Sequence, residues 1–300
     1  MKLHGVFPPI TTPFASDGSL ALDKLRSNVG RYNKTSIAGY IVVGSTGESV
    51  LLVRDEVDRV FAVAREAAAP EKILIAGTGV DSTAETIART NRAAELGYQV
   101  ALVKTPFYYK SQMNPDVLAE HYLRVADAAR IPLLVYAVPQ FTGISVTAPL
   151  IARLAQHPNI IGIKESSGNI LLVGEIVSAV PAGFQTLVGS AGTFLASMVS
   201  GAIGGILAVA CFLPEMCVEL HQAAQQGDIK RAQDLQRRLL PSATMVVSKL
   251  GIAGVKYAMD QVGYYGGLPR RPLLPLSDAA KKEVESVLAE VAQPVPNSAR

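Results

Sequence analysis

The sequence predicts an α/β protein, a (β/α)8 TIM barrel with a C-terminal helical extension. Apolar, β-branched runs alternate with amphipathic helical patterns, and eight such runs occur within the first 210 residues. This alternation implies parallel strands with right-handed crossovers, and eight repeats fit a closed barrel better than an open doubly wound sheet. In chain order the runs are GVFPPITTPF (5–14), AGYIVVGS (38–45), KILIAGTG (72–79), YQVALVKTP (98–106), IPLLVYAVP (131–139), NIIGIKES (159–166), FQTLVGS (184–190) and IGGILAVA (203–210).

Helix-boundary signals separate these runs. The segment DSTAE (81–85) supplies an N-cap and a nearby acid, and TAP (147–149) places a proline near the first turn of another helix. Gly97 and Gly227 stand where C-terminal caps of helices belong. These signals predict helices between the strands and after the last of them.

The last quarter of the chain has a different pattern, in which helical segments follow one another with no strand between them. The segments are DIKRAQDLQRRLLPSATMVV (228–247), VKYAMDQVGYYGG (255–267) and SDAAKKEVESVLAEVA (277–292). We therefore expect two parts, a catalytic barrel over residues 1–225 and a C-terminal helical extension over 226–300. The final QPVPNSAR is expected to be frayed.

Composition and charge argue against several classes of protein. The formal net charge of +3 is small and evenly spread over 300 residues, so nucleic-acid binding is not expected. No apolar run approaches the length of about 20 residues that spans a bilayer. The start, MKLHGVFPPITTPF, lacks the features of a signal peptide, and two cysteines are too few for a disulfide framework. We therefore expect a cytoplasmic protein that binds neither nucleic acid nor membrane.

The sequence predicts no metal site and no bound cofactor. The four histidines, His4, His121, His157 and His221, are scattered singly along the chain. The motifs H-x-x-x-H, C-x-x-C and the Walker loop are absent, so the common metal and phosphate sites are not indicated. The motif G-x-G-x-x-G is absent as well, which argues against a dinucleotide fold.

The stretch IIGIKESSGN (160–169) places Lys164 at the end of an apolar run. Lysine is almost never fully buried unless it is paired, so Lys164 either reaches solvent or is an amine held in a dry site. In a barrel, chemistry occurs where the strands end at their C-terminal side. The functional interpretation is favoured because these ends together carry Thr12, Ser45, Thr46, Thr105, Tyr108, Tyr136, Lys164 and Ser190.

A buried lysine of this kind can act as a nucleophile. Desolvation favours the neutral amine, which attacks a ketone and forms a Schiff base. Tyr136, one strand before Lys164, is the candidate proton shuttle, although a buried tyrosine in a barrel is often only part of the core. Tyr108 and Ser45 are candidates to complete a relay, with Tyr109 as an alternative to Tyr108.

Two further features concern the same end of the barrel. The loop GSTGES (44–49) offers backbone N–H groups that can hold a carboxylate, with the hydroxyl of Thr46 as a further donor. Glu48 is expected to support this loop rather than to act as an acid. Lys104 lies within its strand, and we expect it to be structural and to point outward into the helical layer.

Four motifs together resemble those of a known family. GSTGES, TPFYYK, YAVPQFTG and IGIKESSGN resemble, in order and spacing, the dihydrodipicolinate synthase/N-acetylneuraminate lyase family, and the resemblance covers nearly the whole chain. It implies a pyruvate-handling class I aldolase or lyase on a (β/α)8 barrel, commonly assembled as a homotetramer, a dimer of dimers. It also implies that no cofactor is needed, because the covalent intermediate is an imine between a lysine and the substrate.

The resemblance assigns roles to individual residues of this chain. It implies that Lys164 is the Schiff-base lysine, that Tyr136 relays protons, and that Tyr108 is the relay tyrosine that the synthases borrow from a neighbouring subunit. The substrate-binding residues that we expect are Ser45 and Thr46 at the pyruvate carboxylate and the relay, Ile206 through its backbone near the pyruvyl group, Ser166, and Gly189.

Within the family, the closest resemblance is to 4-hydroxy-2-oxoglutarate aldolase. TPFYYK followed by Met113, LVGSAGTFLASMVSGAIGG and GIAGVKYAMDQVGYYGG carry it. The resemblance implies cleavage of 4-hydroxy-2-oxoglutarate into pyruvate and glyoxylate. Ser166, two residues after the lysine, would help to bind the distal carboxylate.

Competing interpretations differ in the second substrate or in the class of protein. The first is a synthase that condenses pyruvate with aspartate semialdehyde, but Phe141 and Ala137 replace the arginine and asparagine of the synthase motif Y-N-V-P-x-R-T-G. An aromatic ring cannot make the bidentate carboxylate contact of arginine. The segment GSAG (189–192) lacks the acidic residues with which sialic acid lyases hold sugar hydroxyls. The sequence also leaves open a 2-oxo sugar acid dehydratase or aldolase, and a non-catalytic barrel that binds a 2-oxo acid.

Overall fold

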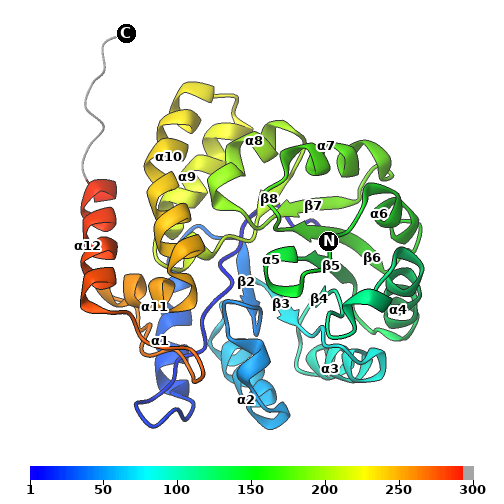
Figure 1. The fold of residues 1–300 in the computed structure, drawn as a ribbon, viewed down its shortest axis with the longest axis horizontal. Coiled ribbons are helices and arrows are strands. Elements are labelled where there is room, and N and C mark those ends of the chain that lie inside the picture. Colours follow the sequence, from blue (N-terminus) through cyan, green and yellow to red (C-terminus); the bar gives the residue numbers. More distant parts are fainter. Residues whose placement is uncertain (293–300) are drawn as a thin grey trace.

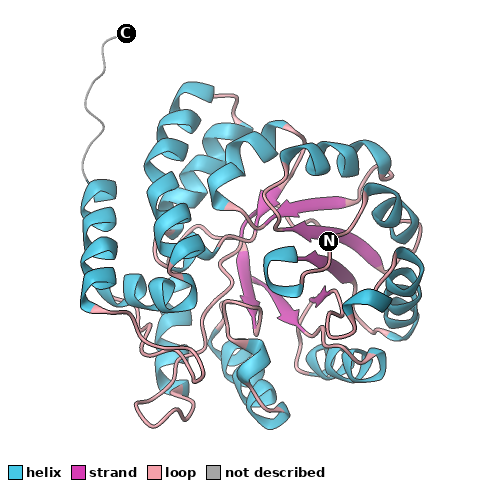
Figure 2. Cartoon of the chain, viewed as in Figure 1, coloured by secondary structure: helices cyan, strands magenta, loops and turns pink. Residues whose placement is uncertain are grey.

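The computed structural model describes residues 1–292, in which eight parallel strands form one sheet in the order β1-β8-β7-β6-β5-β4-β3-β2. The strands form the wall of a barrel, and helices lie around it (Figures 1 and 2). The predicted (β/α)8 barrel is therefore confirmed. The strands are β1 (Gly5–Val6), β2 (Gly39–Val42), β3 (Ile73–Gly77), β4 (Val100–Lys104), β5 (Leu133–Ala137), β6 (Ile160–Glu165), β7 (Gln185–Val188) and β8 (Gly204–Gly205).

Single hydrogen bonds, rather than a full ladder, connect the segment of β1 to β2. Ala38 N donates to Val6 O at 2.9 Å, and Ile41 N donates to Pro8 O at 3.1 Å. These bonds complete the wall of the nearly closed barrel, so that the C-terminal ends of the strands face one common mouth.

The first strand is much shorter than the predicted run over 5–14. It ends at Val6, and Pro8, Pro9 and Pro13 follow it. Proline has no backbone N–H to donate to a neighbouring strand, so a segment this rich in proline cannot continue a ladder.

The helices begin and end largely where the boundary signals predict. Ser82 and Thr147 are the N-cap residues of α3 and α6, and each accepts a hydrogen bond from a backbone N–H three residues later. Gly97 and Gly227 have φ angles of +84° and +73°, the left-handed conformation of a helix C-cap. The helices up to the last strand are α1 (Leu22–Tyr32), α2 (Arg54–Ala67), α3 (Thr83–Glu95), α4 (Pro115–Ala128), α5 (Pro139–Thr142), α6 (Ala148–Leu154), α7 (Ile170–Ala179) and α8 (Phe194–Val199), with the short 3-10 helices η1 (Ser49–Leu51), η2 (Lys110–Gln112) and η3 (Ala191–Thr193).

Side chains alternate between two buried environments along the strands. Leu134 and Tyr136 belong to the cluster inside the barrel, whereas Leu133 and Val135 belong to the cluster between the strands and the helices. This alternation follows from the two-residue period of a strand. It places Tyr136 inside the barrel, near the C-terminal end of β5.

The last quarter of the described chain is helical, as predicted, and contains no strand. α10 packs against α9, and α11 packs against α12; Figure 1 shows this group beside the barrel, next to α1. No helix within residues 1–292 is long and apolar enough to cross a membrane.

The division of the chain at 225/226 stays a prediction, and QPVPNSAR lies outside the described residues. The elements after β8 are η4 (Ala208–Cys211), α9 (Pro214–Gln225), α10 (Ile229–Pro241), the π-helical segment η5 (Ser242–Lys249), α11 (Gly251–Gln261) and α12 (Asp278–Ala292).

Candidate active site

Lys164 and Tyr136 lie together inside the barrel, near the ends of neighbouring strands. They are register partners between β5 and β6, and Nζ of Lys164 is 4.2 Å from the centroid of the Tyr136 ring. Each side chain is only 5% exposed. The structure therefore places the predicted nucleophile in a dry site, against the face of the predicted proton shuttle.

Burial changes the acid–base properties of both groups. Desolvation lowers the pKa of Lys164 to about 7, because the charged ammonium loses its hydration. The same cause raises the pKa of Tyr136 to about 12, although the neighbouring hydroxyls of Ser45 and Ser166 act in the opposite direction. Near neutral pH, a substantial fraction of the lysine is therefore the nucleophilic amine, while the phenol keeps its proton and can donate it.

Ser45 extends this pair into the predicted relay. Its Oγ is 3.3 Å from the hydroxyl of Tyr136, and either oxygen can be the donor. Ser45 lies in the loop that follows β2, where Glu48 N donates to Ser45 O at 3.0 Å and Gly47 N donates to Gly44 O at 3.0 Å. These tight turns fix the position of the serine relative to the tyrosine.

Glu48 ends the same loop in an unusual conformation and at a fully buried position. Its φ angle is +57°, in the left-handed region that few residues other than glycine adopt. Its carboxylate forms an ion pair with Lys256, with 2.5 Å between Oε1 and Nζ, and both side chains are 0% exposed. Arg270 N donates to the other carboxylate oxygen at 2.7 Å. The prediction that Glu48 supports the loop is confirmed.

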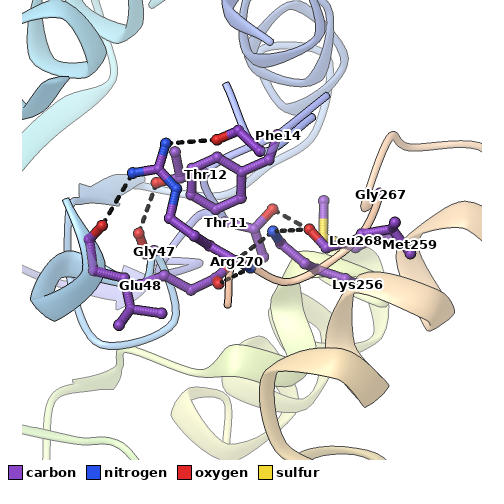
Figure 3. Close-up of polar contacts among 12 residues, drawn as sticks. Thr11, Thr12, Phe14, Gly47, Glu48, Lys256, Met259, Gly267, Leu268 and Arg270 are labelled. Atoms are coloured by element: carbon purple, nitrogen blue, oxygen red, sulfur yellow. Dashed lines mark hydrogen bonds and ion pairs between the residues drawn. The ribbon is translucent and has the colours of Figure 1, made fainter. Parts of the chain in front are cut away.

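The partners of Glu48 come from the C-terminal extension, as Figure 3 shows. Lys256 lies on α11 and also donates to Leu268 O at 3.0 Å. The guanidinium of Arg270 makes two hydrogen bonds to Glu56, at 2.5 and 2.7 Å, and a third to Leu51 O at 3.0 Å. The extension therefore holds both Glu48 and the segment directly after the loop.

Ser166 and Gly189 lie beside Lys164. A Cβ atom at Gly189 would be 2.0 Å from Ser166 Oγ and 3.1 Å from Lys164 Cε, so only glycine fits there. Ser166 is 7% exposed, and its Oγ makes no hydrogen bond of regular geometry within the described part of the chain, yet it lies close enough to the Tyr136 hydroxyl to lower the pKa of that phenol. Gln140 Nε2 donates to Ser166 O at 2.7 Å and fixes the backbone. A buried hydroxyl that is held beside Lys164 and Tyr136 and has unused hydrogen-bonding capacity is suited to bind a ligand.

Thr46 and Ile206 occupy different parts of the site. Thr46 is 9% exposed, in the loop that also carries Ser45. Ile206 is 1% exposed in the cluster inside the barrel that contains Tyr136, and its N–H donates to Val188 O at 2.9 Å. Both predicted substrate-binding residues therefore lie with the lysine and tyrosine rather than elsewhere on the molecule.

Tyr108 and Tyr109 are the predicted residues that one chain does not bring into the site. They are 74% and 69% exposed, and their rings form a T-shaped pair 5.1 Å apart. No hydrogen bond within residues 1–292 joins either of them to Ser45 or Tyr136. Within a single chain the relay therefore ends at Ser45, and the choice between the two tyrosines stays open.

Lys104 does not leave the sheet toward the helical layer, so the outward direction expected for it is wrong, whereas its expected structural role stays a prediction. It is the register partner of Tyr136 between β4 and β5, so its side chain leaves the sheet on the inner face. Together with Ser45, Ser49, Gly79 and Tyr136 it lines a cavity at the barrel mouth. Burial lowers the pKa of Lys104 to about 8. Its position at the end of β4, two residues after the inward-facing Leu102, is the signal in the sequence that indicates this direction.

No group of three or more His, Cys, Asp or Glu side chains within residues 1–292 is placed to hold one metal ion. The histidines make other contacts instead. His121 Nδ1 is 2.9 Å from Thr83 Oγ1, and His157 Nε2 is 3.0 Å from Asp127 Oδ1.

Comparison with known proteins assigns this architecture to a family. The model of the dihydrodipicolinate synthetase family matches residues 2–291. The chain is 36% identical over 289 residues to the 4-hydroxy-tetrahydrodipicolinate synthase of Methanothrix thermoacetophila, which covers 96% of this chain and 97% of that protein. It is 34% identical over 286 residues to the enzyme of the same name from Exiguobacterium sp., with coverage of 95% and 97%.

Solved structures give the same result. The chloride-inhibited dihydrodipicolinate synthase from Acinetobacter baumannii, complexed with pyruvate, has a TM-score of 0.92 and 28% sequence identity, with coverage of 97% of this chain and 99% of that one. These relatives carry the name of the synthase, so the predicted closeness to 4-hydroxy-2-oxoglutarate aldolase is not shown. The chain belongs to the dihydrodipicolinate synthetase family and is a lyase of the class I aldolase type.

Proposed function

We propose that this chain joins pyruvate to an aldehyde, or reverses that reaction, through a Schiff base on Lys164. The observation that carries this proposal is the position of the amine, which is 5% exposed and 4.2 Å from the centroid of the Tyr136 ring. A lysine that burial shifts toward its neutral form is the nucleophile that this reaction requires. The solved relative with pyruvate bound supports pyruvate as the first substrate.

The residues at the mouth divide the proposed reaction between them. The amine of Lys164 adds to the C2 ketone of pyruvate, and loss of water gives the imine. Tyr136, hydrogen-bonded to Ser45, moves protons as water leaves. Loss of a proton from C3 to the relay then gives an enamine, whose C3 attacks the aldehyde carbon and forms the C3–C4 bond, while the aldehyde oxygen takes up a proton from Tyr136 and becomes the C4 hydroxyl. Hydrolysis of the new imine releases the product and restores the amine.

The pyruvate carboxylate needs donors close to the imine. We assign this role to the loop after β2, where Ser45 and the buried Thr46 carry hydroxyls. The ion pair between Glu48, in this loop, and Lys256, on α11, holds the loop in place. Donors fixed before the substrate arrives bind an anion without further loss of conformational freedom.

The relatives favour aspartate semialdehyde as the aldehyde. Both sequence relatives named above are 4-hydroxy-tetrahydrodipicolinate synthases, and their similarity extends over nearly the full length of the chain. This assignment makes the chain a synthase, which the sequence left open as a competing interpretation.

A second aldehyde, glyoxylate, is favoured by one residue. Phe141 occupies the place of the carboxylate-binding arginine of the synthase motif and is 64% exposed at the mouth. Without that guanidinium, the larger semialdehyde loses its bidentate contact. Glyoxylate needs fewer contacts, and the buried hydroxyl of Ser166 beside Lys164 offers one. Cleavage of 4-hydroxy-2-oxoglutarate to pyruvate and glyoxylate is therefore the second candidate.

The two candidates are separated by offering each aldehyde to the enzyme and pyruvate. Consumption of aspartate semialdehyde with formation of the cyclised product supports the synthase. Formation of 4-hydroxy-2-oxoglutarate from glyoxylate, and its cleavage in reverse, supports the aldolase. The ratio of kcat/KM for the two aldehydes decides the assignment, because each aldehyde competes for the same enamine.

The pH dependence of imine formation is the first prediction. The pKa of Lys164 is lowered to about 7, and the neutral amine is the reactive form. The rate of pyruvate adduct formation should rise about tenfold per unit of pH below 7 and level off above it. Stopped-flow trapping at subsaturating pyruvate measures this rate. A rate that keeps rising toward pH 10 would show an amine with the ordinary pKa of lysine.

We further propose a cytoplasmic homo-oligomer, a tetramer formed as a dimer of dimers. The exposed pair of Tyr108 and Tyr109 supports this assembly, because two large aromatic side chains on one surface are typical of an interface. Tyr108 of one subunit would then extend the relay of its neighbour beyond Ser45.

The second prediction tests this assembly. Tyr108→Phe should lower kcat by about 10- to 100-fold, because a relay loses its hydroxyl, while the mass measured by sedimentation stays that of the wild type. Tyr109→Phe is the matched control and should retain activity. A wild-type protein that sediments as a fully active monomer would contradict the shared relay.

A further inference from the structure

We propose that Lys104 is a specificity-determining residue, whose ammonium binds the carboxylate of the aldehyde substrate at the barrel mouth. The inference rests on the proposed function, since it concerns the second substrate of the Schiff-base reaction. It names the substrate class as an aldehyde that carries a carboxylate near its reacting carbon.

The strand pattern directs this lysine into the barrel. Along β4, Val100 and Leu102 belong to the cluster inside the barrel, whereas Ala101 and Val103 belong to the cluster beneath the helices. Lys104 is the next residue of the inner series. A lysine on this face, at the end of a barrel strand, lies where substrates bind.

The register across three strands brings Lys104 to the level of the catalytic pair. Lys104 is the partner of Tyr136, and Tyr136 is the partner of Lys164. The three side chains therefore leave neighbouring strands at one level, with the tyrosine between the two lysines. The lining of one cavity by Lys104, Tyr136 and Ser45 agrees with this arrangement.

The ammonium is held in place and still has free donors. Nζ of Lys104 donates one hydrogen bond to Gly79 O at 2.5 Å and lies 5.8 Å from the centroid of the Phe107 ring. The Asp81 carboxylate lies close enough to favour the charged ammonium, but no hydrogen bond joins the two groups within residues 1–292. An ammonium has three N–H donors, so two remain for a ligand. The pKa of Lys104, lowered by burial to about 8, still leaves most of the group protonated at pH 7.

The carboxylate of the aldehyde substrate needs a positively charged partner, and the arginine that supplies it in the synthase motif is absent from this chain. Both candidate aldehydes carry a carboxylate, and Phe141 stands where the synthase motif has its arginine. A lysine is a point charge that can pair with a carboxylate without the two-pronged geometry of arginine. Of the buried lysines near this mouth, Lys256 already pairs with Glu48, and Lys164 is the amine that forms the imine.

Lys110 is the competing cation and provides the matched control. It lies on η2, in the same connection after β4, and is exposed. Its Nζ would be 3.1 Å from a Cβ at Gly143, so it lies near the end of α5 and outside the lined cavity. Lys104→Met removes a positive charge from the lining of the cavity, and Lys110→Met removes an equal charge outside it.

The experiment measures KM for the aldehyde and KM for pyruvate in the wild type, Lys104→Met, Lys104→Arg and Lys110→Met. The carboxylated aldehyde is whichever of glyoxylate and aspartate semialdehyde the wild type uses, and acetaldehyde is the uncharged comparison. Borohydride trapping of the pyruvate adduct on Lys164 is measured for every variant.

We expect Lys104→Met to raise KM for the carboxylated aldehyde by about 10- to 100-fold, with little change in KM for pyruvate. Lys104→Arg should recover part of this loss, and Lys110→Met should match the wild type. Any turnover of acetaldehyde should change little. A normal KM for the carboxylated aldehyde in Lys104→Met, an equal loss with both aldehydes, or a loss of pyruvate trapping would overturn the assignment. Absence of the pyruvate adduct in the wild type would instead refute the proposed function.

Discussion

Replacement of Lys164 with alanine is expected to lower turnover with pyruvate by about 10,000-fold or more. The amine is the group that forms the covalent bond to the substrate, and no neighbouring residue can replace it at the same place. Lys104 leaves the sheet from the far side of Tyr136, since the two lysines are partners of the same tyrosine on opposite strands. The measurement is the steady-state rate with the accepted aldehyde.

Lys110→Ala is the control for this variant, because it removes an exposed lysine from the connection after β4. It should keep near-normal turnover. Near-normal turnover in Lys164→Ala, with a folded protein, would remove the Schiff base from the mechanism.

Replacement of Lys256 with methionine is expected to lower the free energy of unfolding by about 3–5 kcal/mol. The pair with Glu48 is fully buried, with 2.5 Å between the charged atoms. Loss of the ammonium leaves a buried carboxylate without its ion-pair partner, and the backbone N–H of Arg270 and the more distant Arg270 charge offset only part of its desolvation cost. Urea unfolding at a fixed protein concentration measures the change.

Two matched variants separate the charge effect from a simple loss of packing. The double variant Glu48→Gln with Lys256→Met removes both charges and should recover a large part of the lost stability. Lys249→Met removes an exposed partner of Glu283, whose ion pair spans 3.2 Å, and should cost less than about 1 kcal/mol. A loss in Lys256→Met that is no larger than in Lys249→Met would contradict this explanation.

The same ion pair connects stability to substrate binding. Glu48 ends the loop that carries Ser45 and Thr46, so a loop released from Lys256 should bind the pyruvate carboxylate less well. We therefore expect Lys256→Met to raise KM for pyruvate, while KM for the aldehyde changes less. Lys104→Met is expected to have the opposite effect, a higher KM for the aldehyde with little change in KM for pyruvate. Each variant therefore serves as a control for the other.

The sequence predicts the barrel well because strands and helices leave local patterns. The inward direction of Tyr136 follows from alternation within one strand, and the helix starts at Ser82 and Thr147 follow from capping residues. The short β1 is also consistent with its sequence, since its prolines cannot donate to a ladder.

Other features depend on contacts that no local pattern records. Glu48 and Lys256 are more than 200 residues apart in the chain, and the sequence around either residue does not identify its partner. The outward direction expected for Lys104 is wrong because a lysine after an apolar run need not turn toward the helices, and the alternation along β4 points inward. Tyr108 is exposed in one chain, so its role depends on a second copy that one sequence does not describe.

The most direct measurement is borohydride reduction of the enzyme in the presence of pyruvate, followed by peptide mass spectrometry. The proposed mechanism predicts one reduced pyruvyl group, located on Lys164 and absent from Lys164→Ala. An adduct on Lys104 instead, or a folded wild-type enzyme that forms none, would contradict the claim that Lys164 is the amine that bonds to the substrate.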